Sequence, residues 1–297
     1  MFLKTKLLRA QMFLLRPIAT QTGDIKTVRT LQEESGKLIT NHRVAFEQMM
    51  LNGVETCVAT PPERRPERGI LLYLHGGGYT AGKLEYAKGF GSTLAVRTGY
   101  PVLFPAYRLA PEAPYPAALE DAELAYRHLL TTGYPASKIV LCGESAGGGL
   151  CYALCLRLRD AGLPLPAGII AISPWTDLTL SGDSYATNAE EDPLLTVEEL
   201  AFDAACYAGG ESLTNPYISP LYGDLTGLPP SLLFAGSAEL LLDDMTAMFE
   251  RLRASGCQAR RFIAPEMWHA YVLYGVEEAE PDFVRIGDFV RELFEES

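Results

Sequence analysis

The feature that most constrains the fold is a regular alternation of short apolar runs with helical patterns, which extends from about residue 70 to the end of the chain. The runs are almost continuously apolar, which is typical of strands buried on both faces. Strands that alternate with helices predict a mostly parallel sheet with helices on both sides, the α/β class. The predicted strands are Ile70–Leu74, Val102–Phe104, Ile139–Cys142, Ile169–Ile172, Leu232–Ala235 and Arg261–Ala264.

Helical patterns fill the segments between these strands, and the clearest are Ala118–Leu130, Leu150–Asp160 and Asp243–Ala254. Because the alternation runs evenly to the C-terminus, we expect a single domain over residues 1–297, a length that can bury a full core. Ahead of the alternation, residues 44–60 predict a hairpin, because Asn52-Gly53 favours the left-handed backbone angles of a tight turn.

Two segments fall outside this alternation. Residues 181–215 contain the helical pattern Val197–Tyr207 and interrupt the rhythm of the sheet strands, and residues 1–40 precede the hairpin. Insertions between sheet strands often build lids over active sites. We therefore expect these two segments to form a small helical cap.

The composition, with 48% hydrophobic and 21% charged residues, is that of an ordinary globular protein and excludes disordered and collagen-like classes. The formal net charge of -12 argues against a nucleic-acid partner, whose phosphates require a basic face. The charge is uneven, because residues 1–30 carry +5 and the remainder carries -17. A basic, apolar-rich start permits a signal peptide, a membrane-surface helix or an amphipathic helix that packs on the protein.

We favour the packed helix. A signal peptide needs an unbroken apolar core of roughly 7–15 residues, whereas charged and polar residues interrupt every apolar run near the start. No stretch approaches the roughly 18 apolar residues of a membrane span, so we expect no stable membrane insertion. The apolar residues that recur at near-helical spacing, and that we expect to pack on the protein, are Leu3, Leu7, Leu8, Phe13, Leu14 and Leu15.

The cysteine pattern argues against both a zinc site and a disulfide scaffold. None of the six cysteines forms C-x-x-C and the chain has only four histidines, which argues against zinc. A chain of this length can form a core without the support of disulfides. We expect no metal, reduced thiols and a cytoplasmic protein. The cysteines are Cys57, Cys142, Cys151, Cys155, Cys206 and Cys257.

A candidate nucleophile lies between a predicted strand and a predicted helix. Gly143-Glu144-Ser145-Ala146-Gly147 matches G-x-S-x-G, in which a sharp turn exposes the serine and glycines avoid collisions two residues away on each side. The helix N-terminus adds positive potential for a developing negative charge. The alternative is a glycine-rich turn with an idle serine, but the strand–turn–helix context favours Ser145 as a nucleophile.

A candidate oxyanion hole follows the strand Ile70–Leu74. His75-Gly76-Gly77-Gly78 lets the backbone come close and turn its amides inward. We predict the N–H groups of Gly76 and Gly77 as donors, with Ala146 as the third. A phosphate-binding loop is the alternative, but no Gly-Lys-Ser/Thr follows and the G-x-G-x-x-G spacing is absent.

Elimination selects the general base and its partner. In enzymes whose nucleophile lies in a G-x-S-x-G turn, the acid and then the histidine follow the serine along the chain. Only His269 lies downstream of Ser145. The acid should follow a strand between them, and Glu239 lies nearest the end of Leu232–Ala235. Asp243 is the reserve candidate, although it is predicted in the first turn of a helix, where acids complement the dipole. The other histidines are His42, His75 and His128.

Four motifs occur together and in order, and the chain resembles the hormone-sensitive-lipase-like branch of the α/β hydrolases, the bacterial-type carboxylesterases. The resemblance implies an eight-stranded sheet, a helical cap built from the N-terminus and an insertion, and hydrolysis of short acyl esters without a cofactor. The motifs are His75-Gly76-Gly77-Gly78, Tyr107-Arg108-Leu109-Ala110-Pro111-Glu112, Gly143-Glu144-Ser145-Ala146-Gly147-Gly148 and Ser173-Pro174-Trp175-Thr176-Asp177-Leu178.

Two positions depart from the family pattern. The family often has Asp before the nucleophile where this chain has Glu144, and its acid position usually reads Asp-Pro-Leu where this chain has Glu239-Leu240-Leu241. The resemblance therefore places the acid at Glu239. It also assigns structural support to Tyr107, Trp175 and Asp177, with a hydrogen bond near the site as the alternative for Asp177.

Aromatic and apolar residues flank the two catalytic loops. Tyr79, Met267, Trp268 and Tyr271 either line an apolar substrate pocket or only pack the loops. We predict a serine carboxylesterase for short-acyl esters, with an acetyl esterase acting on acetylated sugars or drug-like esters as the alternative. A ligand-binding protein that lost catalysis is disfavoured because every catalytic role is filled. The expected partner is a small-molecule ester, and a homodimer is compatible with the sequence.

Overall fold

The computed structural model of the protein describes residues 1–21, 25–65 and 68–295. In these residues one eight-stranded sheet has the order β1-β2-β4-β3-β5-β6-β7-β8. Its strands are β1 (Ala45–Leu51), β2 (Val54–Thr60), β3 (Ile70–Leu74), β4 (Val102–Pro105), β5 (Ile139–Glu144), β6 (Gly168–Ile172), β7 (Ser231–Gly236) and β8 (Ala259–Ala264).

The sheet confirms the predicted architecture. The strands from β3 to β8 pair in parallel, whereas β1 and β2 pair antiparallel with each other and β2 pairs antiparallel with β4. The predicted hairpin is also confirmed, because Leu51 pairs with Val54 and the turn residues Asn52 and Gly53 have φ of 46° and 92°. Each predicted strand appears in the sheet, with its ends shifted by two residues or fewer.

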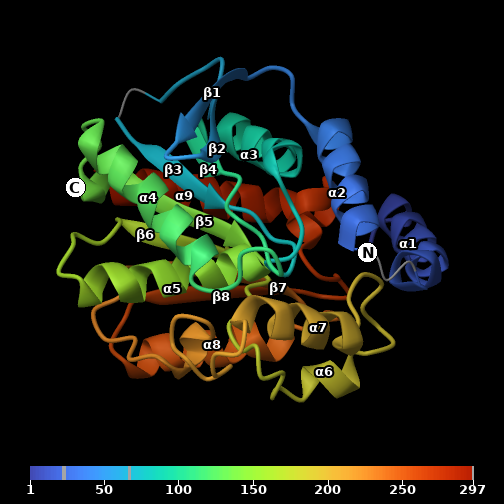
Figure 1. Ribbon diagram of the computed structural model, residues 1–297. Coiled ribbons are helices and arrows are strands. Elements are labelled where there is room, and N and C mark those ends of the chain that lie inside the picture. The colour runs from blue at the N-terminus through green and yellow to red at the C-terminus, as the bar shows by residue number, and fades with distance from the viewer. Residues whose placement is uncertain (22–24, 66–67, 296–297) are drawn as a thin grey trace.

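Helices cover both faces of the sheet (Figure 1). On one face, α4 and α5 pack with α8 around a core that includes Leu72 and Leu150, and on the other α3 and α9 enclose a core that includes Leu71 and Phe90. The α-helices are α1 (Leu3–Gln21), α2 (Ile25–Ile39), α3 (Leu84–Thr98), α4 (Ala117–Thr131), α5 (Ala146–Asp160), α6 (Ser184–Thr187), α7 (Val197–Ala208), α8 (Leu242–Ala254) and α9 (Glu280–Glu295). Short 3₁₀ helices span Ala136–Lys138, Pro220–Tyr222, Tyr271–Tyr274 and Glu277–Ala279.

The segments outside the alternation form helices on one side of the molecule. Figure 1 shows α1, α2, α6 and α7 on its right-hand side, and the predicted helix within residues 181–215 is confirmed as α7. Helix α2 packs closely on α3 at Gly36, where an added Cβ would lie 2.3 Å from the carbonyl oxygen of Glu85. The carboxylate of Glu33 accepts hydrogen bonds from the backbone N–H groups of Lys83, Glu85 and Tyr86 at the start of α3.

The prediction that the apolar stripe of α1 packs on the protein is wrong for half of its members. Leu8 and Phe13 are half-buried, and Leu8 and Met12 pack against the core. That contact occupies one face of the helix, so the apolar residues on the opposite face remain in solvent. Leu15 lies outside the residues whose side chains are described. The residues in solvent are Leu3, Leu7 and Leu14, which are 74%, 58% and 77% exposed.

The six cysteines are free thiols in the structure, and all except Cys206 are buried. Among the described residues, none of the helices combines the length and the apolar character that crossing a membrane would require.

A matched pair of glycine substitutions tests the contact between α2 and α3. Both Gly36 and Gly287 lie inside helices, but an added Cβ at Gly287 meets nothing closer than 3.8 Å. Gly287→Ala should raise the free energy of unfolding by about 0.5–1 kcal/mol, because alanine loses less backbone entropy. Gly36→Ala should lower it by about 1–3 kcal/mol, because the helices must move apart. Denaturant titration measures both, and equal stabilisation by the two substitutions would contradict the contact.

Candidate active site

Ser145 lies in a strained turn between β5 and α5. Its φ of 55° and ψ of -126° lie outside the regions that L-residues ordinarily adopt, as expected of a strand-to-helix turn that carries a nucleophile. The flanking glycines are required by geometry, because an added Cβ at Gly143 would lie 2.3 Å from the carbonyl oxygen of Gly147. Helix α5 begins at Ala146, so its N-terminus points its free N–H groups toward the serine.

The structure brings His269 and Glu239 together. The Nδ1 atom of His269 lies 4.0 Å from Oε1 of Glu239, and both atoms are buried without a hydrogen-bond partner among the described residues. Glu239 follows β7 and His269 follows β8, so both lie at the carboxyl edge of the sheet, where β5 delivers Ser145. The separation is longer than a hydrogen bond, and such pairs tighten when substrate binds.

Ser173 joins the loop of Glu239 to the loop of His269 by two hydrogen bonds. Its hydroxyl donates to Oε2 of Glu239 at 2.7 Å and accepts the backbone N–H of Ala270 at 2.9 Å. The same Oε2 accepts the backbone N–H of Gly236 at 2.8 Å. One oxygen of Glu239 is therefore fixed by two donors, and the other is left facing His269.

Burial favours the neutral forms of both groups. It lowers the pKa of His269 to about 3 and raises the pKa of the Glu239 carboxyl well above its usual range. The backbone N–H of Gly236 and the Ser173 hydroxyl oppose the second shift. A neutral imidazole is the form that can accept a proton, so the desolvated site keeps His269 ready to act as a base.

Asp243 has a different partner. It lies in the first turn of α8, as predicted, and its Oδ2 accepts the backbone N–H of Ser184 at 2.8 Å. The Ser184 hydroxyl in turn accepts the backbone N–H of Asp243 at 3.1 Å. These reciprocal bonds tie α8 to α6 instead of supporting His269.

The prediction of Gly76 as an oxyanion donor is wrong. Its N–H donates to Oε1 of the buried Glu144 at 2.6 Å and is therefore not free to bind a substrate oxygen. Glu144 also accepts the hydroxyl of Tyr86 at 3.2 Å. Among the described residues, the backbone N–H groups of Gly77, Gly78 and Ala146 donate to no other protein group.

Side chains from distant elements position the glycine loop. The Tyr107 hydroxyl donates to the carbonyl oxygen of His75 at 2.7 Å, and the two rings stack with centroids 4.1 Å apart. From α2, Arg29 donates to the carbonyl oxygen of Thr80 at 2.7 Å. From α7, Asp203 accepts the Thr80 hydroxyl at 2.7 Å, and burial raises the pKa of this carboxyl to about 7. Helices α2 and α7 therefore each contribute a hydrogen bond to Thr80, which fixes the end of the glycine loop.

Comparison with known proteins agrees with this arrangement. The model of a family described as alpha/beta hydrolase fold matches residues 71–273. The chain belongs to the α/β-hydrolase fold family. Within it, the matches include hormone-sensitive lipases and solved esterases of the bacterial hormone-sensitive lipase family, as the sequence motifs predict.

Curated relatives and solved structures cover most of the chain. It is 39% identical to an acetyl-hydrolase of Streptomyces hygroscopicus over 86% of this chain and 85% of that one. It is 34% identical to an esterase of Acinetobacter venetianus, with 75% of each chain covered. A crystal structure of an esterase from the bacterial hormone-sensitive lipase family superposes with a TM-score of 0.91 and 37% identity, covering 96% of this chain and 98% of that one.

The four predicted pocket residues are buried. Tyr79 stacks on Tyr207 of α7 with ring centroids 3.6 Å apart, and the Tyr271 hydroxyl donates to Asp282 of α9. Met267 and Trp268 are fully buried in the core cluster that also contains Tyr271. These contacts give all four a packing role in this α/β hydrolase, and their place in a substrate pocket stays a prediction.

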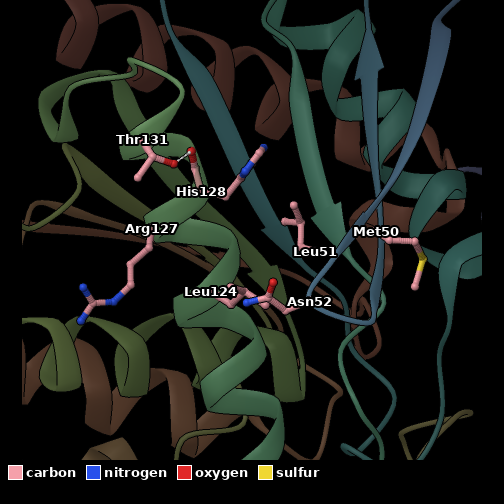
Figure 2. A pocket seen from close by; sticks show the side chains of 7 residues that line it. All are labelled: Met50, Leu51, Asn52, Leu124, Arg127, His128 and Thr131. Atoms are coloured by element: carbon pink, nitrogen blue, oxygen red, sulfur yellow. Dashed lines mark hydrogen bonds between the residues drawn. The ribbon is translucent and has the colours of Figure 1, made fainter.

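His128, one of the histidines not assigned to the site, lies elsewhere. Figure 2 shows His128 of α4 at a shallow pocket beside Leu51 and Asn52, at the tip of the β1–β2 hairpin. This is the β1 edge of the sheet, and the strands β2, β4 and β3 separate it from β5. The position agrees with its elimination as the base.

Several positioning residues of the site were not singled out by sequence. Ser173 lies in one of the family motifs, so its place directly after β6 was an available signal for a residue at the carboxyl edge. Arg29 and Asp203 carry no such signal, because they lie in segments that only the tertiary structure brings to the glycine loop. Glu144 was noted as a departure from the family, but its hydrogen bond to Gly76 was not foreseen.

The buried carboxyl of Glu144 predicts a specific pH dependence of stability. Burial raises its pKa from 4.5 to about 7, so between these values the folded chain binds a proton that the unfolded chain releases. Stability from this group is present below pH 4.5 and is lost as the pH rises through 7, by about 3 kcal/mol in total. The free energy of unfolding should fall less steeply with pH in Glu144→Gln than in the wild type.

Denaturant titrations at several pH values across this range measure the slopes. The exposed Glu190→Gln should follow the wild type and serves as the control. Identical slopes in the wild type and Glu144→Gln would show that Glu144 ionises in the folded protein as it does in the unfolded chain.

Proposed function

We propose that the protein is a serine carboxylesterase in which Ser145, His269 and Glu239 form the catalytic triad. The observation that carries the proposal is the strained turn at Ser145, at the same sheet edge as the buried pair of His269 and Glu239. The esterases and acetyl-hydrolases among its relatives support an ester substrate.

The first half of the reaction forms an acyl-enzyme. Ser145 Oγ attacks the ester carbonyl carbon while His269 accepts the hydroxyl proton. Glu239 orients the imidazole, and its ionised form, which accepts hydrogen bonds from the Gly236 N–H and the Ser173 hydroxyl, stabilises the imidazolium that forms. Collapse of the tetrahedral intermediate breaks the bond to the alcohol oxygen, and the imidazolium returns its proton to the departing alcohol.

The second half repeats these steps with water. His269 takes a proton from water as its oxygen attacks the acyl carbon, and the proton then passes to Ser145 Oγ when the acyl bond breaks. The products are the carboxylic acid and the free serine. No cofactor is needed, because proton transfer and charge stabilisation account for every step.

The oxyanion that forms in both halves needs preorganised donors. The unpaired N–H groups of Gly77 and Ala146 fit this role, and Gly78 replaces Gly76 as the third donor. Glu144 then has a positioning role, because its hydrogen bond to the Gly76 N–H fixes the residue before the proposed donor Gly77.

The length of the acyl group that the enzyme accepts distinguishes an acetyl esterase from a general carboxylesterase. Similarity to an acetyl-hydrolase favours the acetyl esterase alternative, in which acetylated sugars or drug-like esters are substrates. A panel of nitrophenyl esters from acetate to decanoate separates the two. A steep preference for acetate supports the acetyl esterase, and a broad short-chain range supports a general carboxylesterase.

The free thiols support a reducing compartment, which we propose is the cytoplasm. A small-molecule ester is the expected partner, and the homodimer stays a prediction.

The nucleophile is tested by Ser145→Ala. Turnover of nitrophenyl butyrate should fall by at least about 10³-fold, because the reaction loses its covalent intermediate. The wild type, but not the variant, should gain the mass of a phosphonate inhibitor on the peptide that contains Ser145. Ser255→Ala, beyond α8, serves as the control and should retain full activity. Equal turnover by the wild type and Ser145→Ala would overturn the proposal, as would calorimetric binding of esters by an inactive wild type.

The acid is tested by comparing Glu239→Ala with Asp243→Ala. Glu239→Ala should lower kcat by about 10³–10⁴-fold, because the imidazole loses its orienting partner. Asp243→Ala should change kcat by less than about tenfold, since its carboxylate pairs with Ser184 in α6. The assignment is wrong if only Asp243→Ala abolishes turnover while both variants remain folded by circular dichroism.

A further inference from the structure

Helix α1 exposes an apolar stripe to solvent. Leu3, Leu7, Ala10 and Leu14 recur at intervals of four, three and four residues, so they share one face of the helix, and all four are exposed. Leu3 and Leu14 are 74% and 77% exposed and Leu7 is 58% exposed, so the row forms a contiguous apolar strip in solvent, and such strips mark interaction surfaces. We call this row of four residues the α1 stripe.

The opposite face of α1 is anchored to the protein. The Thr5 hydroxyl donates to the Glu278 carboxylate at 2.6 Å, and Arg9 forms an ion pair with Glu191 at 2.9 Å. Leu8 packs against the hydrophobic core. These contacts fix the rotation of the helix about its axis, so the outward direction of the stripe is a property of the fold.

Lysines flank the α1 stripe on both sides. At about 100° per residue, Lys4 falls on one side of the stripe and Lys6 on the other, and both are exposed. The acidic residues that contact α1 do so from its anchored side, where Glu278 and Glu191 already bind Thr5 and Arg9. The outward face of α1 is therefore apolar with a basic border.

This combination points to one partner. Helices with an apolar face bordered by lysines lie in the interface of anionic bilayers, with the leucines among the acyl chains and the lysines at the headgroups. A second copy of the chain fits less well, because pairing two α1 stripes brings the lysine borders of both copies together. We propose that the α1 stripe docks the protein peripherally onto an anionic lipid bilayer.

The location of α1 decides which part of the protein faces the lipid. The N-terminal amine lies 3.6 Å from the Glu266 carboxylate, three residues before His269. Arg9 contacts Glu191, which lies in the segment 181–215. Docking therefore sets the bilayer beside the loop of His269 and the helices α6 and α7. The docking does not depend on the esterase chemistry.

Vesicle co-sedimentation of the full chain tests the proposal. The protein should sediment with vesicles of phosphatidylcholine and phosphatidylglycerol, bind pure phosphatidylcholine more weakly, and dissociate from the anionic vesicles as salt rises. Leu7→Ser and Leu14→Ser should each weaken binding about tenfold, because each removes an apolar side chain that docking would bury in the bilayer. Lys4→Gln and Lys6→Gln should each weaken binding to the anionic vesicles about fivefold.

Met50→Ser is the matched control, because Met50 is 60% exposed on β1 and lies outside the α1 stripe. It should bind as the wild type does, and an unchanged thermal unfolding midpoint shows that each variant folds. The proposal is overturned if the wild type fails to bind anionic vesicles at low salt, or if the leucine substitutions leave binding unchanged. A concentration-dependent dimer that Leu7→Ser abolishes, without vesicle binding, would assign the stripe to a second copy instead.

Discussion

The close approach of two chain segments underlies the whole site. The turn after β5 passes so near the end of β3 that a Cβ on Gly147 would lie 2.0 Å from the carbonyl oxygen of Leu74. This approach sets Ser145 beside the glycine loop, where a Cβ on Gly76 would lie 3.0 Å from the serine Cβ. A side chain at Gly147 would separate the nucleophile from the loop that receives the developing charge, whatever else the fold provided.

Buried polar side chains then hold the loops around this contact. Glu144 binds the N–H of Gly76, and Ser173 joins Glu239 to the backbone beside His269. Each bond satisfies a group that would otherwise be buried without a partner, which makes the loop arrangement costly to disturb. Burial also favours the neutral imidazole of His269, which is the form that a general base requires.

Much of the fold and of the candidate site could be predicted from the sequence, because the relevant signals are local. Strands buried on both faces must be continuously apolar, so their positions are written in the sequence. Ser145 was found because a strand-to-helix turn needs glycines at fixed distances, and His269 because no other histidine follows that serine. Glu239 could be predicted because it comes directly after β7, and the parallel pairing of β7 with β8 places the ends of both strands, and so Glu239 and His269, at the same edge of the sheet.

What the sequence could not decide depends on which groups meet across the fold. The motif at residues 75–78 offers several amides, and only the carboxylate of Glu144 on the neighbouring strand β5 removes Gly76 from the set. Helical periodicity groups the apolar residues of α1 into faces, but it cannot say which face is covered, because apolar residues occur on both. The sequence by itself determined the elements and the reactive side chains, since both depend on local pattern. The tertiary structure alone decided which amides stay free and which leucines meet solvent, because burial is a property of what packs alongside.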